Sequence, residues 1–218
     1  MQMKHARAGG FTLIELLIVV GIIGVLAAAF LPDLLAGKEV ANIAADESNL
    51  KQHYMWMELY SGKTKVGHMP TEGGHKFLLD TWVRKVIEHT PENFDRFFSP
   101  GRRENDPHYI ELKEQVARGE PIWPDARSLT SLDTHYAGRA KEFLSSMTTS
   151  ANEAWAANDN EDGWTFPGGT VNILYNGGAV RALSLQTMMD QFQWQGKEQV
   201  FKTWGKDSPH KDLQKLDN

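Results

Sequence analysis

The chain has 218 residues, no cysteine and a formal net charge of −5 at pH 7. The lack of cysteine excludes disulfides, thiolate metal sites and cysteine nucleophiles. The acidic balance argues against a general nucleic-acid binder, which needs a basic surface to neutralise phosphates. Because 23% of the residues are charged, we expect a water-soluble body of one domain, and a long apolar run is a local exception.

The N-terminal segment begins with MQMKHARAGG, in which Lys4 and Arg7 are the only full charges. An apolar run follows, and residues 16–31 contain no charged side chain. With residues 11–14 in front, the run approaches the roughly 20 residues that span a bilayer. The basic residues before the run predict a single span with a cytoplasmic N-terminus and a body outside the cytoplasm.

Three interpretations of this segment are open. A secretory signal peptide would be cut after the apolar region, near Ala29 or Gly37, where small residues occur. A plain signal anchor would stay uncut, but it leaves the carboxylate of Glu15 without a role inside an apolar run. The third interpretation places the cut before the apolar run, between Gly10 and Phe11.

The third interpretation is supported by a family resemblance. GGFTLIE at residues 9–15, followed by the unbroken apolar run and Pro32, resembles the class III signal peptide of type IV pilins and type II secretion pseudopilins. The resemblance implies that a membrane aspartyl peptidase, the prepilin peptidase, cuts after Gly10 and N-methylates Phe11. It also implies that Glu15 and Pro32 are assembly residues of a filament.

The chemistry of Glu15 fits this implied role. A carboxylate within a membrane costs several kcal/mol unless it is paired. Cleavage would create an α-amino cation on Phe11, one helical turn from Glu15, and the amine of one subunit would meet Glu15 of a neighbour. Such a pair would fix the axial register of packed helices. Small residues such as Gly21 and Gly24 would allow close helix packing, and Pro32 should loosen the helix.

The helical pattern continues beyond the apolar run to about Tyr60. Over residues 38–60 apolar side chains recur about every 3.6 residues, in a stripe formed by Val40, Ile43, Ala44, Leu50, Tyr54 and Met57. Shorter helices are predicted over 75–89, 90–98 and 108–119, the second of them opened by a Thr90 cap and Pro91. Residues 120–139 are expected to be rich in loops.

The C-terminal part changes to strand patterns. A short strand is predicted over 153–157, and TVNILY, NGG and AVRALSL over 170–185 predict a β-hairpin. Its inward face would carry Val171, Ile173 and Tyr175. A helix is predicted over 186–194, followed by a polar, mobile tail over 205–218.

The hairpin is also similar to a motif that ends many pilin-like proteins, namely His, nine residues and Asp-Gly. Here Phe166 and Asn176 stand in place of the His and the Asp, and Gly177 is retained. Since Asn tolerates positive φ as Asp does, the turn geometry is expected to survive. A ligand role for the two replaced side chains is not expected.

NDNEDG at residues 158–163 is similar to the start of a calcium loop. Asn158, Asn160 and Asp162 would supply alternating oxygen ligands, with Gly163 at the sixth position. The bidentate Glu required at the twelfth position is replaced by Gly169. The segment therefore predicts either a weak calcium site or a solvated turn, and no other cofactor is expected. No nucleophile-elbow, phosphate-loop or HExxH motif occurs, so we predict that the chain is not an enzyme.

Together these patterns predict an α+β, pilin-like fold, in which a long N-terminal helix packs against a small C-terminal antiparallel sheet with additional short helices. The predicted organisation comprises a leader over 1–10, a transmembrane or filament-core helix over 11–37, the second half of the helix with a globular domain over 38–204, and a polar tail over 205–218.

The resemblance implies a structural subunit of a type II secretion pseudopilus or of a type IV pilus-like filament. It implies a place in the inner membrane, with the body in the periplasm or on a cell-surface filament. Implied partners are like subunits, minor pilins, the prepilin peptidase, the inner-membrane assembly platform and, indirectly, the assembly ATPase, but no nucleic acid. The alternative is a membrane-anchored extracytoplasmic binding module that uses the helix only as a tether.

Overall fold

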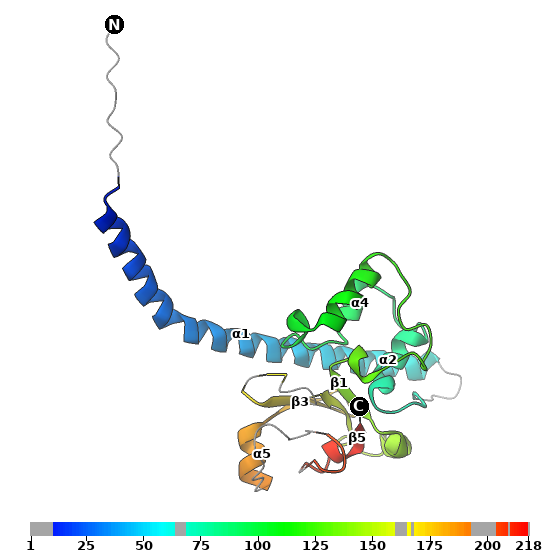
Figure 1. Ribbon diagram of the computed structural model, residues 1–218. Coiled ribbons are helices and arrows are strands. Elements are labelled where there is room, and N and C mark those ends of the chain that lie inside the picture. Colours follow the sequence, from blue (N-terminus) through cyan, green and yellow to red (C-terminus); the bar gives the residue numbers. More distant parts are fainter. Residues whose placement is uncertain are drawn as a thin grey trace. The chain divides into compact units, whose positions relative to one another are not determined.

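The computed structural model describes residues 11–63, 69–159, 165–166, 168–192, 204–208 and 210–217 (Figure 1). The chain divides into two units, Met1–Val40 and Ala41–Asn218. Helix α1, Leu13–Lys63, contributes to both, which confirms the predicted long N-terminal helix. The second unit combines the end of α1 with short helices and an antiparallel sheet, as expected for the predicted α+β fold.

Within the second unit, helix α1 buries one face. The buried side chains on this face are Asp46, Asn49, Leu50, His53, Trp56, Met57 and Tyr60. The predicted apolar stripe is confirmed for Leu50 and Met57, which are fully buried, but it is wrong for Val40 and Ala44, which are exposed. The stripe fails near its start because polar residues with partners in the body occupy the buried positions.

In the described part of the chain, five antiparallel strands form one sheet in the order β4-β3-β2-β1-β5. The strands are β1 Tyr136–Arg139, β2 Ala154–Asn158, β3 Thr170–Tyr175, β4 Val180–Ser184 and β5 Leu216–Asp217. The strand predicted over 153–157 and the hairpin predicted over 170–185 are confirmed as β2 and β3–β4. Val171, Ile173 and Tyr175 belong to one buried cluster, as the period of two predicts.

The β3–β4 turn differs from expectation in one detail. The positive φ angles belong to Gly177 and Gly178, at +91° and +80°, and Asn176 does not adopt one. Tyr175 N donates to Ala179 O at 2.8 Å and closes the turn. A Cβ added to Gly178 would lie 2.9 Å from the ring of Tyr54 on α1, so the hairpin tip packs directly on the helix.

Three helices connect α1 to the sheet, namely α2 His75–Val83, α3 Pro91–Asp95 and α4 Pro107–Ala117. Helix α2 is shorter than the predicted 75–89, because Lys85 adopts a left-handed φ of 54° just beyond its end. The predicted cap of α3 is confirmed, since Thr90 Oγ1 accepts from Asn93 N at 3.2 Å. Asp106 caps the start of helix α4, and its side chain accepts a hydrogen bond from His108 N at 2.9 Å. Beyond the end of α4, Gly119 adopts a φ of +71°.

Shorter elements complete the body. Helix α5 is Leu185–Phe192, and single 3₁₀ turns lie at Arg103–Asn105 (η1), Ser131–Asp133 (η2), Lys141–Ser146 (η3) and Leu213–Lys215 (η4). Helix α5 begins directly after β4, close to the start predicted for the helix over 186–194.

Strands β1 and β5 were not predicted from the sequence. Strand β1 lies in a segment that was expected to be loop-rich, and β5 lies in the tail expected to be mobile. In the tail, Leu213 and Leu216 are buried, and Leu216 pairs with Arg139 of β1. The prediction failed because the few apolar side chains of a mostly polar segment fill a core that only the folded chain creates.

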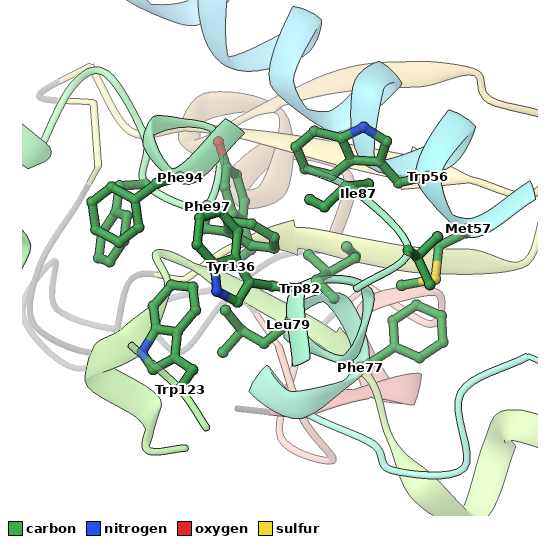
Figure 2. Close-up of a cluster of buried hydrophobic side chains, with 14 of the residues drawn as sticks. Trp56, Met57, Phe77, Leu79, Trp82, Ile87, Phe94, Phe97, Trp123 and Tyr136 are labelled. Carbon is green, nitrogen blue, oxygen red and sulfur yellow. The ribbon is translucent and has the colours of Figure 1, made fainter. Parts of the chain in front are cut away.

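Among the described residues the core forms two clusters, and neighbouring residues of one strand can belong to different clusters. Leu174 of β3 belongs to the larger cluster and Ile173 to the smaller one. Figure 2 shows part of the larger cluster, in which aromatic rings from α1, α2, α3 and β1 gather, including Trp56, Trp82 and Phe97. The ring centroids of Trp56 and Phe97 lie 5.5 Å apart and those of Trp82 and Phe97 lie 6.0 Å apart. Because each fully buried large side chain contributes about 1.5–3 kcal/mol, this cluster is the main source of stability in the body.

Candidate functional site

Helix α1 begins with a reciprocal cap that involves Glu15. Thr12 precedes the first helical residue, and its N–H and its Oγ1 both donate to Glu15 Oε2, at 2.8 and 2.7 Å. Glu15 N donates back to Thr12 Oγ1 at 3.3 Å. This capping box satisfies backbone donors that the helix start would leave open. The side chain of Glu15 therefore has a local role in its own helix, which the sequence analysis did not anticipate although Thr-x-x-Glu is a known signal.

The first unit exposes its apolar side chains. Between Leu13 and Leu35 the large apolar side chains are 45% to 82% exposed. Soluble proteins rarely present such a continuous apolar surface, which marks a membrane or an assembly interface. Among the described residues, α1 is the one helix long and apolar enough to cross a membrane by length and composition.

The other predicted processing and assembly residues occupy this region. Gly10 lies outside the described residues, and Phe11 is 80% exposed just before the helix. Pro32 lies inside α1, which is assigned as helix on both sides of it. Side chains added at Gly21 or Gly24 would meet nothing within 4 Å, so these positions leave room for a neighbouring helix.

The predicted calcium loop is described only in part. Asn160 and Asp162 lie outside the described residues. Asn158 is buried at the end of β2, and its amide binds Asp46 instead of facing solvent. No group of three or more His, Asp or Glu side chains in the described ranges is arranged to hold a metal ion. A calcium site at this loop stays a prediction.

A buried polar cluster lies where helix α1 meets the sheet. Asp46 is fully buried and accepts hydrogen bonds from Tyr136, Asn158 and Asn172. Burial raises the pKa of Asp46, and the bonds from Asn172, Asn158 and Tyr136 act in the opposite direction. Sequence reasoning missed this cluster. The signal was present as three polar residues, Asp46, Asn49 and His53, spaced along one helical face.

His53 is a second buried polar group on the same face. Its Nε2 lies 2.9 Å from Arg96 O, and its ring packs edge-on against Trp56 with centroids 5.0 Å apart. Burial lowers the pKa of His53 to about 4. The imidazole is therefore neutral at pH 7, and it belongs to the aromatic core and not to an open site.

A pocket of about 360 Å³ in the body is the feature that suits a binding module. It lies between the start of α4, turn η2 and the end of β2, and Asp106, His135 and Asp159 line it. His135 Nδ1 accepts from Ser99 N at 3.2 Å, so its Nε2 carries the proton and donates to Asp106 Oδ2 at 2.7 Å. Burial lowers the pKa of His135, although Asp106 opposes this. Both ring nitrogens of His135 are thus engaged in structural bonds, so His135 is not a free base in this pocket.

Comparison with known proteins identifies the N-terminal segment. The prokaryotic N-terminal methylation motif matches residues 5–31. The chain is 47% identical over 58 residues to a protein of Thermus thermophilus named type IV wide pilus major component PilA4. This similarity covers 27% of the chain and 43% of the relative, so the chain matches less than half of that protein. No solved structure matches the chain significantly.

The methylation motif includes Gly10, Phe11 and Glu15, the residues that carried the resemblance in the sequence. The exposed apolar helix and the small antiparallel sheet agree with the fold that this resemblance predicted. The N-terminal segment thus carries the methylation motif and is similar to a type IV pilus component, and both findings support the predicted resemblance to type IV pilins and pseudopilins.

Proposed function

We propose that the chain is a prepilin-like structural subunit of a filament, either a type II secretion pseudopilus or a type IV pilus-like fibre. It is inserted in the inner membrane by residues 11–37, cut after Gly10 and methylated at Phe11. Its partners are other pilin-like subunits, the prepilin peptidase and the inner-membrane assembly platform. The chain itself has a structural role, and the peptidase is the enzyme that acts on it.

The observation that carries this proposal is an exposed apolar helix with a single carboxylate at its start. Every residue from Leu13 to Leu35 is exposed, and Glu15 lies in the first turn of this helix. An apolar surface of this length needs a lipid or protein environment. In either environment an unpaired carboxylate is costly. A cationic amine on Phe11 of a neighbouring subunit supplies the missing partner.

The similarity to a type IV pilus component does not separate the two kinds of filament. The matched methylation motif covers residues 5–31, the segment whose resemblance extends to both pilins and pseudopilins. The similarity to a component of a type IV pilus favours a pilus-like fibre over the 58 matching residues. The subunit role is the same in both kinds of filament.

The test is the intact mass of the protein purified from its native membrane. We expect the loss of residues 1–10 and the gain of one methyl group. Cleavage near Ala29 or Gly37 would instead identify an ordinary secreted protein. An uncut chain would favour the alternative of a membrane-tethered binding module, for which the pocket at Asp106 and His135 would be the candidate site.

A further inference from the structure

Asp46 is the first fully buried residue of helix α1. Asp46 is 0% exposed, and every described residue of α1 before it is at least partly exposed. Apolar anchors such as Leu50 and Met57 come later in the helix. The junction between the helix and the body therefore depends on a carboxylate and its hydrogen bonds.

Both oxygens of Asp46 receive hydrogen bonds from the sheet. Oδ1 accepts from Tyr136 Oη on β1 at 2.8 Å and from Asn158 Nδ2 on β2 at 3.0 Å. Oδ2 accepts from Asn158 Nδ2 at 2.9 Å and from Asn172 Nδ2 on β3 at 2.8 Å. The three central strands of the sheet thus each supply one donor, and each of these partners is uncharged.

The orientation of the two amides is fixed by the backbone. Asn158 Oδ1 accepts from Asn172 N at 2.8 Å, so the Nδ2 of Asn158 must face Asp46. Asn172 Nδ2 also donates to Ile43 O at 3.1 Å, and a carbonyl oxygen cannot donate in return. Flipping either amide would place acceptor against acceptor. The two amides thus present fixed donors to Asp46, and the hydroxyl of Tyr136 can donate as well, so this set of partners satisfies an ionised carboxylate.

Hydrogen bonds of this kind are directional, whereas the apolar contacts of the same helix are not. A slide of one residue along the helix, or a rotation of about 100° around it, would carry Asp46 away from all three strands. A buried charge without partners is strongly unfavourable, and buried polar groups are best attested as devices that fix register.

We propose that Asp46 is ionised in the folded body and is the positioning residue that sets the rotation and register of helix α1 against the sheet. If the chain is the filament subunit proposed above, this register determines which side of the helix each body occupies. The inference on Asp46 itself does not depend on the filament.

The experiment exchanges the carboxylate and an amide on the full-length chain in detergent. Asp46→Asn places an amide donor among fixed donors, and Asn158→Asp places a second carboxylate beside the first. In the double variant Asp46→Asn/Asn158→Asp, one carboxylate and one amide face each other again. The control is Glu47→Gln, which removes the same charge from the adjacent residue, whose side chain pairs with Lys51 on the helix surface. The readout is amide hydrogen exchange over residues 43–57.

We expect each single variant to exchange roughly tenfold to a hundredfold faster than the parent chain, because a buried polar group loses its partners. The exchange rate of the double variant should return to within about threefold of the rate of the parent chain. The exchange rate of Glu47→Gln should also stay within about threefold of the parent rate. If Asp46→Asn exchanges as slowly as the parent, the carboxylate is not required to be ionised and the proposal fails. It also fails if the double variant is no better than Asn158→Asp, a comparison that holds even if Asp46→Asn does not fold. Since the assay needs no assembly, its failure is separate from a failure of the filament function.

Discussion

Helix α1 carries two carboxylates whose surroundings are opposite. Glu15 is exposed at the start of an apolar surface, and its described hydrogen bonds go to Thr12 of the same helical turn. Asp46 is fully buried, and donors from three strands surround it. One helix therefore contains a carboxylate whose described hydrogen bonds stay within its own turn and a carboxylate that donors from three strands satisfy.

This difference separates the roles of the two regions. In the body, the buried carboxylate of Asp46 and the aromatic rings of the core find partners within the same chain. The apolar half of the helix is incomplete, because its side chains and Glu15 would be satisfied only by lipid or by another subunit. Changes in the apolar half of the helix should therefore affect assembly and leave folding intact. Changes in the body should affect folding first.

The largest effect is expected from Glu15→Gln. Glutamine retains the cap on Thr12, because a capping box accepts Glu or Gln, but it removes the charge. The neighbouring amine would then be unpaired in an apolar bundle at a cost of several kcal/mol. We expect normal insertion and processing but at least a roughly hundredfold loss of filaments, measured by shearing and immunoblotting.

Thr12→Val is the matched control for Glu15→Gln. It removes the hydroxyl from the cap and keeps the carboxylate, so it should cost about 1 kcal/mol of helix stability and leave filaments in place. Normal assembly of Glu15→Gln would contradict the pairing argument and would support the tether. Glu15→Ala should fail like Glu15→Gln, and a difference between the two would measure the contribution of the cap.

In the body, the largest effect is expected from Arg139→Met. Arg139 is fully buried, donates to Ala154 O at 2.7 Å and pairs with Glu153 at 2.7 Å, while Lys215 holds the same carboxylate at 2.8 Å. Removal of one partner from a buried ion pair costs about 3–5 kcal/mol. We expect a loss of this order in urea unfolding of the full-length chain in detergent, followed by tryptophan fluorescence.

The control for the buried pair is Lys141→Met, which breaks an exposed contact to Glu72 at 3.2 Å. Exposed ion pairs contribute about 0–1 kcal/mol, so this variant should unfold almost like the parent chain. Equal losses for Arg139→Met and Lys141→Met would show that burial does not distinguish the two pairs. Filament formation by folded Arg139→Met protein should be unaffected, in contrast to Glu15→Gln.

How much of the molecule the sequence predicted depended on whether the signal was local. Thr90 with Pro91 marks the start of α3, and Asn-Gly-Gly marks the hairpin, because caps and turns are determined by a few adjacent residues. The glycine and phenylalanine at the cleavage motif, with Glu15, likewise lie within one short segment. These signals identified the long helix, the hairpin and the candidate assembly residues.

The missed features depend on residues far apart in the chain. Asp46 has its partners at Tyr136, Asn158 and Asn172. The helical spacing of Asp46, Asn49 and His53 places them on one face, but it does not say that this face is buried. Strand β5 exists because Leu216 pairs with Arg139 on β1. The sequence around β1 and around β5 contains mostly polar or small residues. Only the tertiary pairing therefore reveals these two strands.

A smaller effect is expected from the pH dependence of His53. Because burial lowers the pKa of His53 to about 4 from 6.5, the unfolded chain takes up the proton first. Neutral His53 makes its full contribution to the free energy of unfolding above pH 6.5. This contribution decreases as the pH falls towards 4 and does not change further below pH 4. At 1.36 kcal/mol per pKa unit, the decrease amounts to at most about 3 kcal/mol.

The measurement compares unfolding free energies at pH 7 and pH 4.5 for the parent chain and for His53→Phe. The variant should lose less stability on acidification than the parent chain. Asp46 acts with the opposite sign, because its raised pKa makes the folded body gain stability as the pH falls. The difference between the two chains cancels the titration of Asp46, so an identical slope in both would contradict the assignment of neutral, buried His53.

The smallest effect compares two adjacent glycines at the hairpin tip. Gly177 and Gly178 both have positive φ, but a Cβ at Gly177 would meet nothing within 4 Å, whereas at Gly178 it would lie 2.9 Å from the Tyr54 ring. Gly177→Ala should therefore cost about 1 kcal/mol from backbone strain alone. Gly178→Ala should cost about 1 kcal/mol more, because the hairpin must move away from α1. Urea unfolding measures both, and combining Gly178→Ala with Tyr54→Ala should remove the excess if the contact of the hairpin with the helix is its cause.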